Sequence, residues 1–288
     1  MRLRFRFQTP QSSAIGEAVP EAVALAAAVD RLFSSTLYRP PMLPDVALRV
    51  LSLSKSPDVS FNAIVGLVES DPMFAMSVLK IAASPLYAGH TAPRTIQQAL
   101  LRLGLGTMTD ICMEAAITAR VFRAPGHEGA MRVLRDHSVA VAHLARAVAL
   151  RTPGRADAAF TLGLLHEVGQ AAGIVALATP AIWPGRADPG RLWSLLASAR
   201  GPMTEKLVRA WKLPSDVAQG IVGNTNGDDG SRAAVTVADP IAADLGLGLP
   251  GEKIDPEALE SARESLDLLH SDIRALTSEG KKLLSKVV

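Results

Sequence analysis

Apolar residues recur at helical spacing along most of the 288-residue chain. Val46, Val50 and Leu53 form an i, i+4, i+7 stripe, which is typical of a helix with one buried face. No segment sustains the apolar and polar alternation, rich in β-branched residues, that a half-buried strand requires. The pattern therefore predicts an all-α fold.

Polar residues and prolines mark where these helices begin. Pro44 and Pro72 stand near N1 positions, and Ser60, Asp71 and Thr95 are the expected N-caps. Gly104 is an expected helix end, and a new helix is expected from Thr107. Further helices are predicted over about 129–151, 155–167, 190–199, 203–212, 215–222, 231–246, 256–269 and 270–286.

Composition narrows the classes of function. The 30 Lys and Arg residues nearly balance 28 Asp and Glu residues, so the charge of +2 does not indicate nucleic-acid binding. Arg2, Arg4 and Arg6 alternate with Leu and Phe; they form either a small basic arm for nucleic acid or an acidic surface, or a short edge strand or frayed terminus. The single cysteine, Cys112, is expected to be buried; it excludes an internal disulfide and a Cys-rich zinc site.

The apolar stretches are interrupted by His and Arg, and they are shorter than the ~20 residues that span a bilayer. The basic start has no apolar segment of the secretory type behind it. We therefore predict a cytoplasmic protein with no membrane span.

A His-Glu pair ends the apolar segment TLGLLHEVGQ, at positions 166 and 167. The zinc protease signature His-Glu-x-x-His needs a second histidine four residues after the first. That position is Gln170, and Gly169 before it is expected to end the helix. The protease interpretation is excluded for lack of this ligand.

A different metal site follows from the helical spacing. His137 lies on the apolar stripe of its helix, whereas His143 is turned about 240° away from it. His137 and His166 can meet in the core, and Glu167 and Asp239 would complete four ligands. Imidazole with carboxylate suits divalent Zn, Mn, Fe or Ni.

Structural explanations of the same residues are open as well. A core histidine commonly hydrogen-bonds a backbone carbonyl, and Glu167 near a helix end can be solvated. Asp239 precedes Pro240, as Asp71 precedes Pro72, which is the pattern of an N-cap with proline at N1.

Seven segments in order resemble the HDOD domain, the HD-related output domain of bacterial signalling proteins. The resemblance runs from about residue 38 to about 248 and rests on MLPDVALRVLSL, SDPMFAMSVLKIAASPLY, TIQQALLRLGL, RDHSVAVAHLARAVA, TLGLLHEVGQ, LVRAWKLPSDVAQGI and VADPIAADLG. It implies an all-α fold in which an N-terminal helical bundle packs on a helical lobe related to the HD-type metal phosphohydrolases.

The domain organisation that follows has four parts. RAPGHEGAM, with Pro125, Gly126 and Gly129 close together, is the boundary between the lobes. The parts are an N-terminal extension with one helix (1–36), a first lobe (37–123), an HD-like lobe (124–248) and C-terminal helices (249–288).

The resemblance also assigns the polar residues. His137 stands at the first histidine of the family's metal site, His166 at the histidine of the His-Asp pair, and Asp239 at the final aspartate. Glu167 replaces the aspartate of the pair, and Gln170 replaces a lysine. Relatives with two metals have a His-His pair where this chain has Asn224-Thr225, and a histidine that the segment ARGPMTEK lacks.

Losing these ligands leaves at most one mononuclear site, because two-metal hydrolysis needs a bridging carboxylate and enough imidazoles for both ions. We therefore expect no catalytic residue, no metal and no other cofactor. The resemblance implies that His137, His166, Glu167 and Asp239 are vestigial metal-site positions, and they would be the ligands of any divalent ion that still binds.

The leading hypothesis is a non-catalytic signal-transduction protein that binds a signalling protein partner, with a nucleotide second messenger as a further ligand. Met73, Met76 and Tyr87 are the proposed adaptable binding surface, unless these side chains belong to the core. The alternative hypothesis is a residual metal-dependent phosphohydrolase with a mononuclear His/His/Glu/Asp site.

Overall fold

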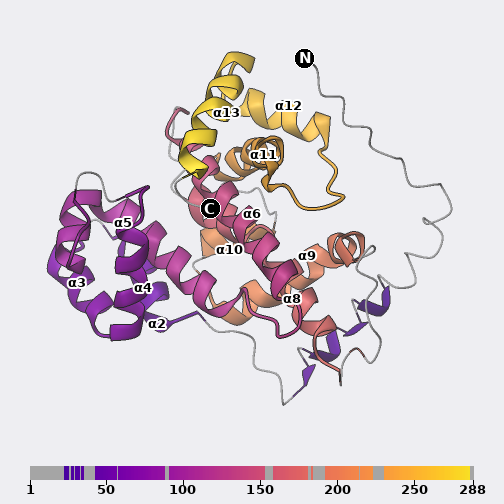
Figure 1. Ribbon diagram of the computed structural model, residues 1–288, viewed down its shortest axis with the longest axis horizontal. Helices are drawn as coiled ribbons and strands as arrows, with labels where there is room; N and C mark the ends of the chain where they lie inside the picture. Colours follow the sequence, from indigo (N-terminus) through magenta and orange to yellow (C-terminus); the bar gives the residue numbers. More distant parts are fainter. Residues whose placement is uncertain are drawn as a thin grey trace.

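The computed structural model contains helices and no strand among the residues that it describes, so the predicted all-α fold is confirmed (Figure 1). Helices gather in two groups, which we call the first lobe (α2–α5) and the second lobe (α6–α13). The described residues are 23–25, 27–28, 30–32, 34–35, 43–56, 58–87, 91–152, 158–180, 183, 192–213, 215–222 and 230–285.

The first lobe is built on one long helix. α5 (Ile96–Arg120) packs against α2 (Asp45–Leu53), α3 (Phe61–Glu69) and α4 (Pro72–Ala82). These helices form the indigo and purple group on the left of Figure 1. Gly104 breaks α5 with φ 78° and ψ 169°, a left-handed φ that suits glycine, where the sequence predicted a helix end.

The predicted N-caps of this lobe are present. The Ser60 hydroxyl accepts a hydrogen bond from the Ala63 backbone N–H at 3.1 Å, and the Thr95 hydroxyl accepts one from Gln98. The Asp71 carboxylate accepts from two backbone N–H groups, each at 3.1 Å. Pro44 is the N-cap residue of α2, one position before the predicted N1.

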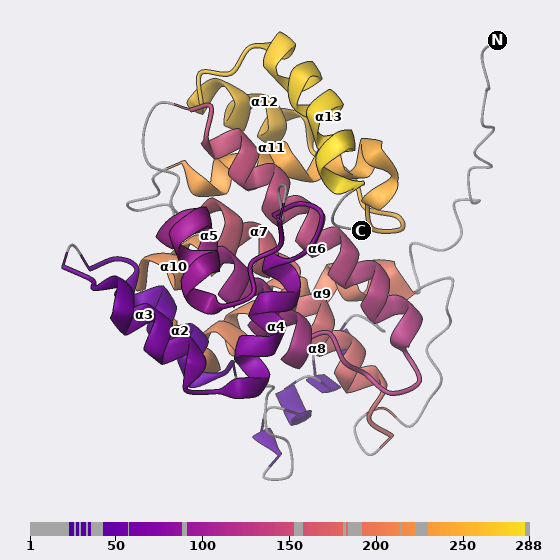
Figure 2. The same cartoon turned by 60° about the vertical axis from the view of Figure 1, so that its left-hand side comes forward.

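The second lobe surrounds α6. This helix packs against α7, α8, α11 and α13, and α12 packs on α11 (Figure 2). The helices of this lobe are α6 (Glu128–Ala149), α7 (Ala159–Leu165), α8 (Val168–Leu177), α9 (Leu192–Trp211), α10 (Ser215–Val222), α11 (Ser231–Ala242), α12 (Pro256–Ser265) and α13 (His270–Leu284). A π-helical segment, Ala243–Leu247, follows α11.

The sequence prediction was wrong at three places in this lobe. α8 was not predicted, and Gly169, an expected helix end, lies inside it; apart from Gln170 its residues are apolar or small, so they show no helical stripe. α9 is one helix with Pro202 inside it, although two helices were predicted on either side of this proline. The helix predicted to run to 246 ends at Ala242, and Gly246 at φ 85° lies in the π-helical segment.

The lobes meet through polar as well as apolar contacts. α5 packs on α7. Arg146 on α6 forms an ion pair with Asp110 on α5 and donates a hydrogen bond to the Thr107 hydroxyl at 2.9 Å. His143 Nε2 lies 3.4 Å from Glu114 Oε2 on α5, so this histidine faces the first lobe.

Part of the N-terminal extension also belongs to the packed structure. Leu25, Ala28 and Leu32 are buried, and Asp30 lies 2.8 Å from Lys206 on α9. Arg2, Arg4 and Arg6 lie outside the described residues. Cys112 is buried as expected, and burial raises the pKa of its thiol to about 12.

One apolar stretch, Ala159–Leu177, has the length and composition to cross a membrane. However, 89% of it is buried inside the protein. It includes α7 and α8 and supplies core side chains such as Phe160 and Leu164. Its hydropathy is explained by its place in the interior of the second lobe.

Gly169 permits the close approach of α8 to α9. A Cβ atom there would lie 2.4 Å from the Arg200 carbonyl oxygen and 2.4 Å from Thr204 Oγ1. Gly169→Ala should therefore lower the free energy of unfolding by about 1–3 kcal/mol through overpacking, measured by urea denaturation.

Gly66→Ala is the matched control. Gly66 lies within α3, and a Cβ there would meet nothing within 4 Å. This variant should gain about 0.5–1 kcal/mol from helix propensity. A Gly169→Ala protein as stable as the natural protein would contradict the close α8–α9 contact.

Candidate metal centre

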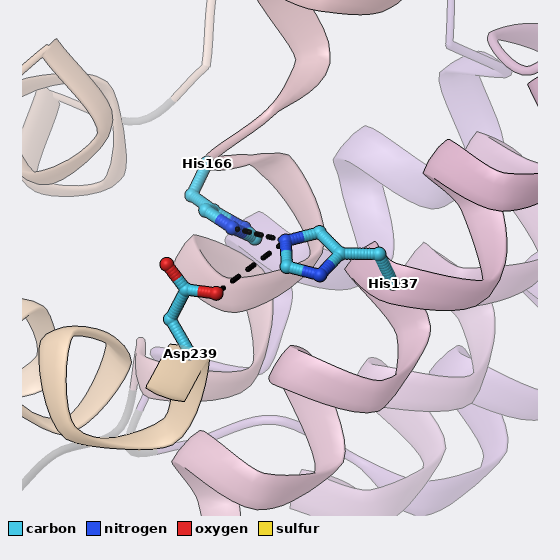
Figure 3. Close-up of side chains that lie close together, drawn as sticks. All are labelled: His137, His166 and Asp239. Atoms are coloured by element: carbon cyan, nitrogen blue, oxygen red, sulfur yellow. Dashed lines mark hydrogen bonds and ion pairs between the residues drawn. The ribbon is translucent and has the colours of Figure 1, made fainter. Parts of the chain in front are cut away.

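Three helical segments bring two histidines and one aspartate together in the second lobe (Figure 3). His137 lies on α6, His166 directly follows α7, and Asp239 lies on α11. One ligand atom from each side chain lies within 4.8 Å of the other two. These segments meet because α6 packs against both α7 and α11.

Backbone carbonyls determine which ring nitrogen of each histidine carries the hydrogen. His137 Nδ1 lies 2.9 Å from the Leu247 carbonyl oxygen, and His166 Nδ1 lies 2.6 Å from that of Gly163. A carbonyl oxygen only accepts, so each Nδ1–H donates and each neutral ring carries its lone pair on Nε2. Burial lowers the pKa of both histidines, so the neutral forms are favoured.

The result is a group of acceptors without a donor between them. The two Nε2 atoms are 3.1 Å apart, and His137 Nε2 is 3.6 Å from Asp239 Oδ1. Two lone pairs cannot hydrogen-bond each other, so the arrangement requires a shared proton or a cation. A backbone hydrogen bond to the far ring nitrogen is also how proteins orient metal-binding histidines.

These residues fit one divalent ion. Two nitrogens at a typical metal distance of about 2.0–2.1 Å from one ion lie roughly 3 Å apart, as observed for His137 and His166. Two imidazoles and a carboxylate form a three-ligand set that leaves positions open. His137, His166 and Asp239 would hold the ion.

Glu167 does not join this group as a free ligand. It is fully buried, so its interpretation as a solvated helix end is wrong. Its Oε2 accepts a hydrogen bond from Gln170 Nε2 at 2.6 Å, and its Oε1 forms an ion pair with Arg200. Oε1 also lies 3.8 Å from His166 Nε2, but the guanidinium already occupies it.

Arg200 supplies the charge that balances this carboxylate. Burial raises the pKa of Glu167, and the adjacent guanidinium opposes that rise. Burial likewise lowers the pKa of Arg200, but the charge of Glu167 outweighs it and leaves the pKa raised. The pair therefore stabilises two charges that each would be costly alone.

Sequence analysis missed Arg200 and Glu252. In the sequence around Arg200 the family resemblance points only to a missing histidine, although an arginine among apolar residues is itself a signal for a buried carboxylate. Glu252 follows the end of the family resemblance and lies 3.9 Å from Arg200. Burial and the charges of Asp239 and Glu167 raise its pKa to about 7.

His166 and Asp239 line a cavity of about 350 Å³, within the range of small-molecule sites. The wall carries both signs of charge, so it does not select strongly for an anion. Its polar side chains include those of His166, Arg200, Arg232, Asp239, Glu252 and Lys253.

The structure describes some of the remaining predicted positions, and others lie outside the described residues. Asp239 is not an N-cap, because it lies in the last turn of α11 with Pro240 inside the same helix. Gln170 is buried and serves Glu167, and its Oε1 has no partner in the part of the chain that the structure describes. Asn224 and Thr225 lie outside the described residues.

Comparisons with known proteins agree with this architecture. No curated protein matches the chain. Among solved structures, an HDOD domain protein of unknown function from Geobacter sulfurreducens has 22% identity and a TM-score of 0.63, covering 92% of this chain and 99% of its own. A proposed signal transduction protein from Marinobacter aquaeolei has 20% identity and a TM-score of 0.67, covering 96% of this chain and 66% of its own.

A proposed phosphohydrolase from Shewanella amazonensis has 21% identity and a TM-score of 0.60, covering 92% of this chain and 98% of its own. At these identities the likeness concerns the fold. The family model of the HDOD domain matches residues 41–225, which is more than half of the sequence. Since this match covers most of both helical lobes, the chain belongs to the HDOD domain family.

Proposed function

We propose that this chain is a cytoplasmic, non-catalytic signal-transduction protein that acts by binding another protein. The observation that carries this proposal is that the Glu167 carboxylate is already engaged by other side chains of the protein. Arg200 and Gln170 hold both of its oxygens inside the protein. A carboxylate held in this way is not free to bridge two metal ions, which two-metal phosphoester hydrolysis requires.

A surface on the first lobe supports the binding role. Met73 and Met76 on α4 are 78% and 65% exposed, so the interpretation of these side chains as core is wrong. Unbranched, polarisable methionine side chains suit adaptable protein contacts. Tyr87 is half-buried near the ring of His143, with 6.0 Å between ring centroids, and so lies beside the contact between the lobes.

A second function has a specific observation in its favour. The three acceptors of His137, His166 and Asp239 converge beside a cavity, which is the arrangement that a single catalytic ion needs. Such an ion would polarise a phosphoryl oxygen and lower the pKa of bound water. The alternative is therefore a mononuclear metal phosphohydrolase, in which Arg200 would hold Glu167 beside the ion.

Removing Arg200 should destabilise the protein, because the buried Glu167 carboxylate loses its counter-charge. Arg200→Ala leaves Glu167 buried without its cation and should lower the free energy of unfolding by about 1–3 kcal/mol, measured by urea denaturation. Glu167→Gln in the same protein should recover most of this loss, because a neutral amide needs no counter-charge.

Arg209→Ala is the control on the same helix. Arg209 is 78% exposed and pairs with Glu205 at the surface, so its loss should change stability by less than about 1 kcal/mol. Equal effects of the two arginine variants would refute a special role for Arg200.

Metal analysis separates the two functions. Protein purified without added metal should contain less than about a tenth of an equivalent of Zn, Mn, Fe or Ni, and it should not hydrolyse bis(p-nitrophenyl) phosphate with added Mn²⁺. The reason is that the Glu167 carboxylate is held by Arg200 and Gln170, so it is not available as a further ligand. Stoichiometric metal, lost in His166→Ala together with metal-dependent hydrolysis, would replace the first proposal by the second.

Partner binding should depend on the exposed methionines. Affinity capture from the native host with Met73→Gln/Met76→Gln should lose a partner that the natural protein retains. Leu150→Gln is the matched control, because Leu150 is 77% exposed at the end of α6. A partner captured equally by all three proteins binds elsewhere, and no partner with any of them would contradict the binding role.

A further inference from the structure

A second cavity lies where α5 ends and α6 begins, with a volume of about 540 Å³. Arg123 lines it from the connector, and Arg132 and Arg135 line it from α6. Glu128 is the one carboxylate among its lining residues. Glu128, Arg132 and Arg135 follow i, i+4, i+7 spacing, which places them on one face of α6. The wall therefore has an excess of positive charge.

Two of the three guanidinium groups are available to a ligand. Arg135 donates hydrogen bonds to Asp136 Oδ1 at 2.9 and 2.7 Å. Glu128 is engaged as well, since its Oε1 accepts from the Gly126 backbone N–H at 2.9 Å. Within the described part of the chain, the side chains of Arg123 and Arg132 have neither an ion-pair partner nor a hydrogen bond.

The floor of the cavity is apolar. Phe122, Ala124 and Met131 contribute to its lining and are no more than 8% exposed. The volume lies within the range of about 300–1,000 Å³ that small-molecule sites occupy. An apolar floor beside two guanidinium groups that have no partner among the described residues suits a ligand with a flat, weakly polar part and an anionic part.

We propose that this cavity binds a nucleoside phosphate, with its phosphates on Arg123 and Arg132 and its base against Phe122 and Met131. The planar guanidinium fork matches two phosphate oxygens at once, and two such forks suit a group with several oxygens and more than one negative charge. Such a ligand would tie the connector between the lobes to α6. This site is separate from the candidate metal centre and does not depend on the function proposed above.

Isothermal titration calorimetry with ATP tests the site, with pyrophosphate and adenosine as probes for its two halves. EDTA in the buffer removes metal ions and with them any contribution of the candidate metal centre. ATP should bind more tightly than pyrophosphate or adenosine alone. Arg123→Gln/Arg132→Gln should weaken ATP binding at least about tenfold, the usual effect of losing a charge-assisted hydrogen bond.

Arg274→Gln is the matched control, because Arg274 is an exposed arginine on α13 outside the cavity, and it should leave affinity within about twofold. Circular dichroism checks folding, and the two single variants replace the double variant if it aggregates. The proposal is overturned if ATP does not bind at 1 mM, if the control weakens binding equally, or if the double variant binds normally. Tighter binding of an aspartate-rich peptide than of ATP would overturn it too and assign the cavity to a protein partner.

Discussion

The second lobe is arranged around one electrostatic constraint, the burial of the Glu167 carboxylate. An isolated carboxylate in the protein interior is costly, and it is tolerated only with a counter-charge and hydrogen bonds. Arg200 and Gln170 meet both needs. The close approach of α9 to α8 at Gly169 places Arg200 near Glu167, so helix packing and charge compensation in this lobe depend on each other.

Much of the fold could be predicted from local signals. Ser60, Asp71 and Thr95 act through their own neighbours in sequence, and a cap of this kind is visible without a structure. The apolar stripe of α6 likewise placed His137 in the core. α8 was missed because it is buried on all sides. It therefore lacks the contrast between an exposed polar face and a buried apolar face by which most helices are predicted.

The candidate site was predictable only in part, for the same reason. His137, His166 and Asp239 could be found from spacing and family resemblance. Arg200 acts across 33 positions of sequence, and nothing in its own neighbourhood identifies its partner. The Leu247 carbonyl is a backbone group, so the residue type gives no sign that it accepts a hydrogen bond from His137. Its position follows from the π-helical segment after α11.

The backbone anchors of the two histidines have a consequence for how the centre would respond to its surroundings. Because main-chain carbonyls hold both rings, their orientation is fixed before any cation arrives. Capture of an ion would therefore cost little conformational entropy, and preorganisation would partly compensate for the small number of ligands. Since such capture would require almost no rearrangement, the metal-free and metal-bound forms would present nearly the same surface to a partner.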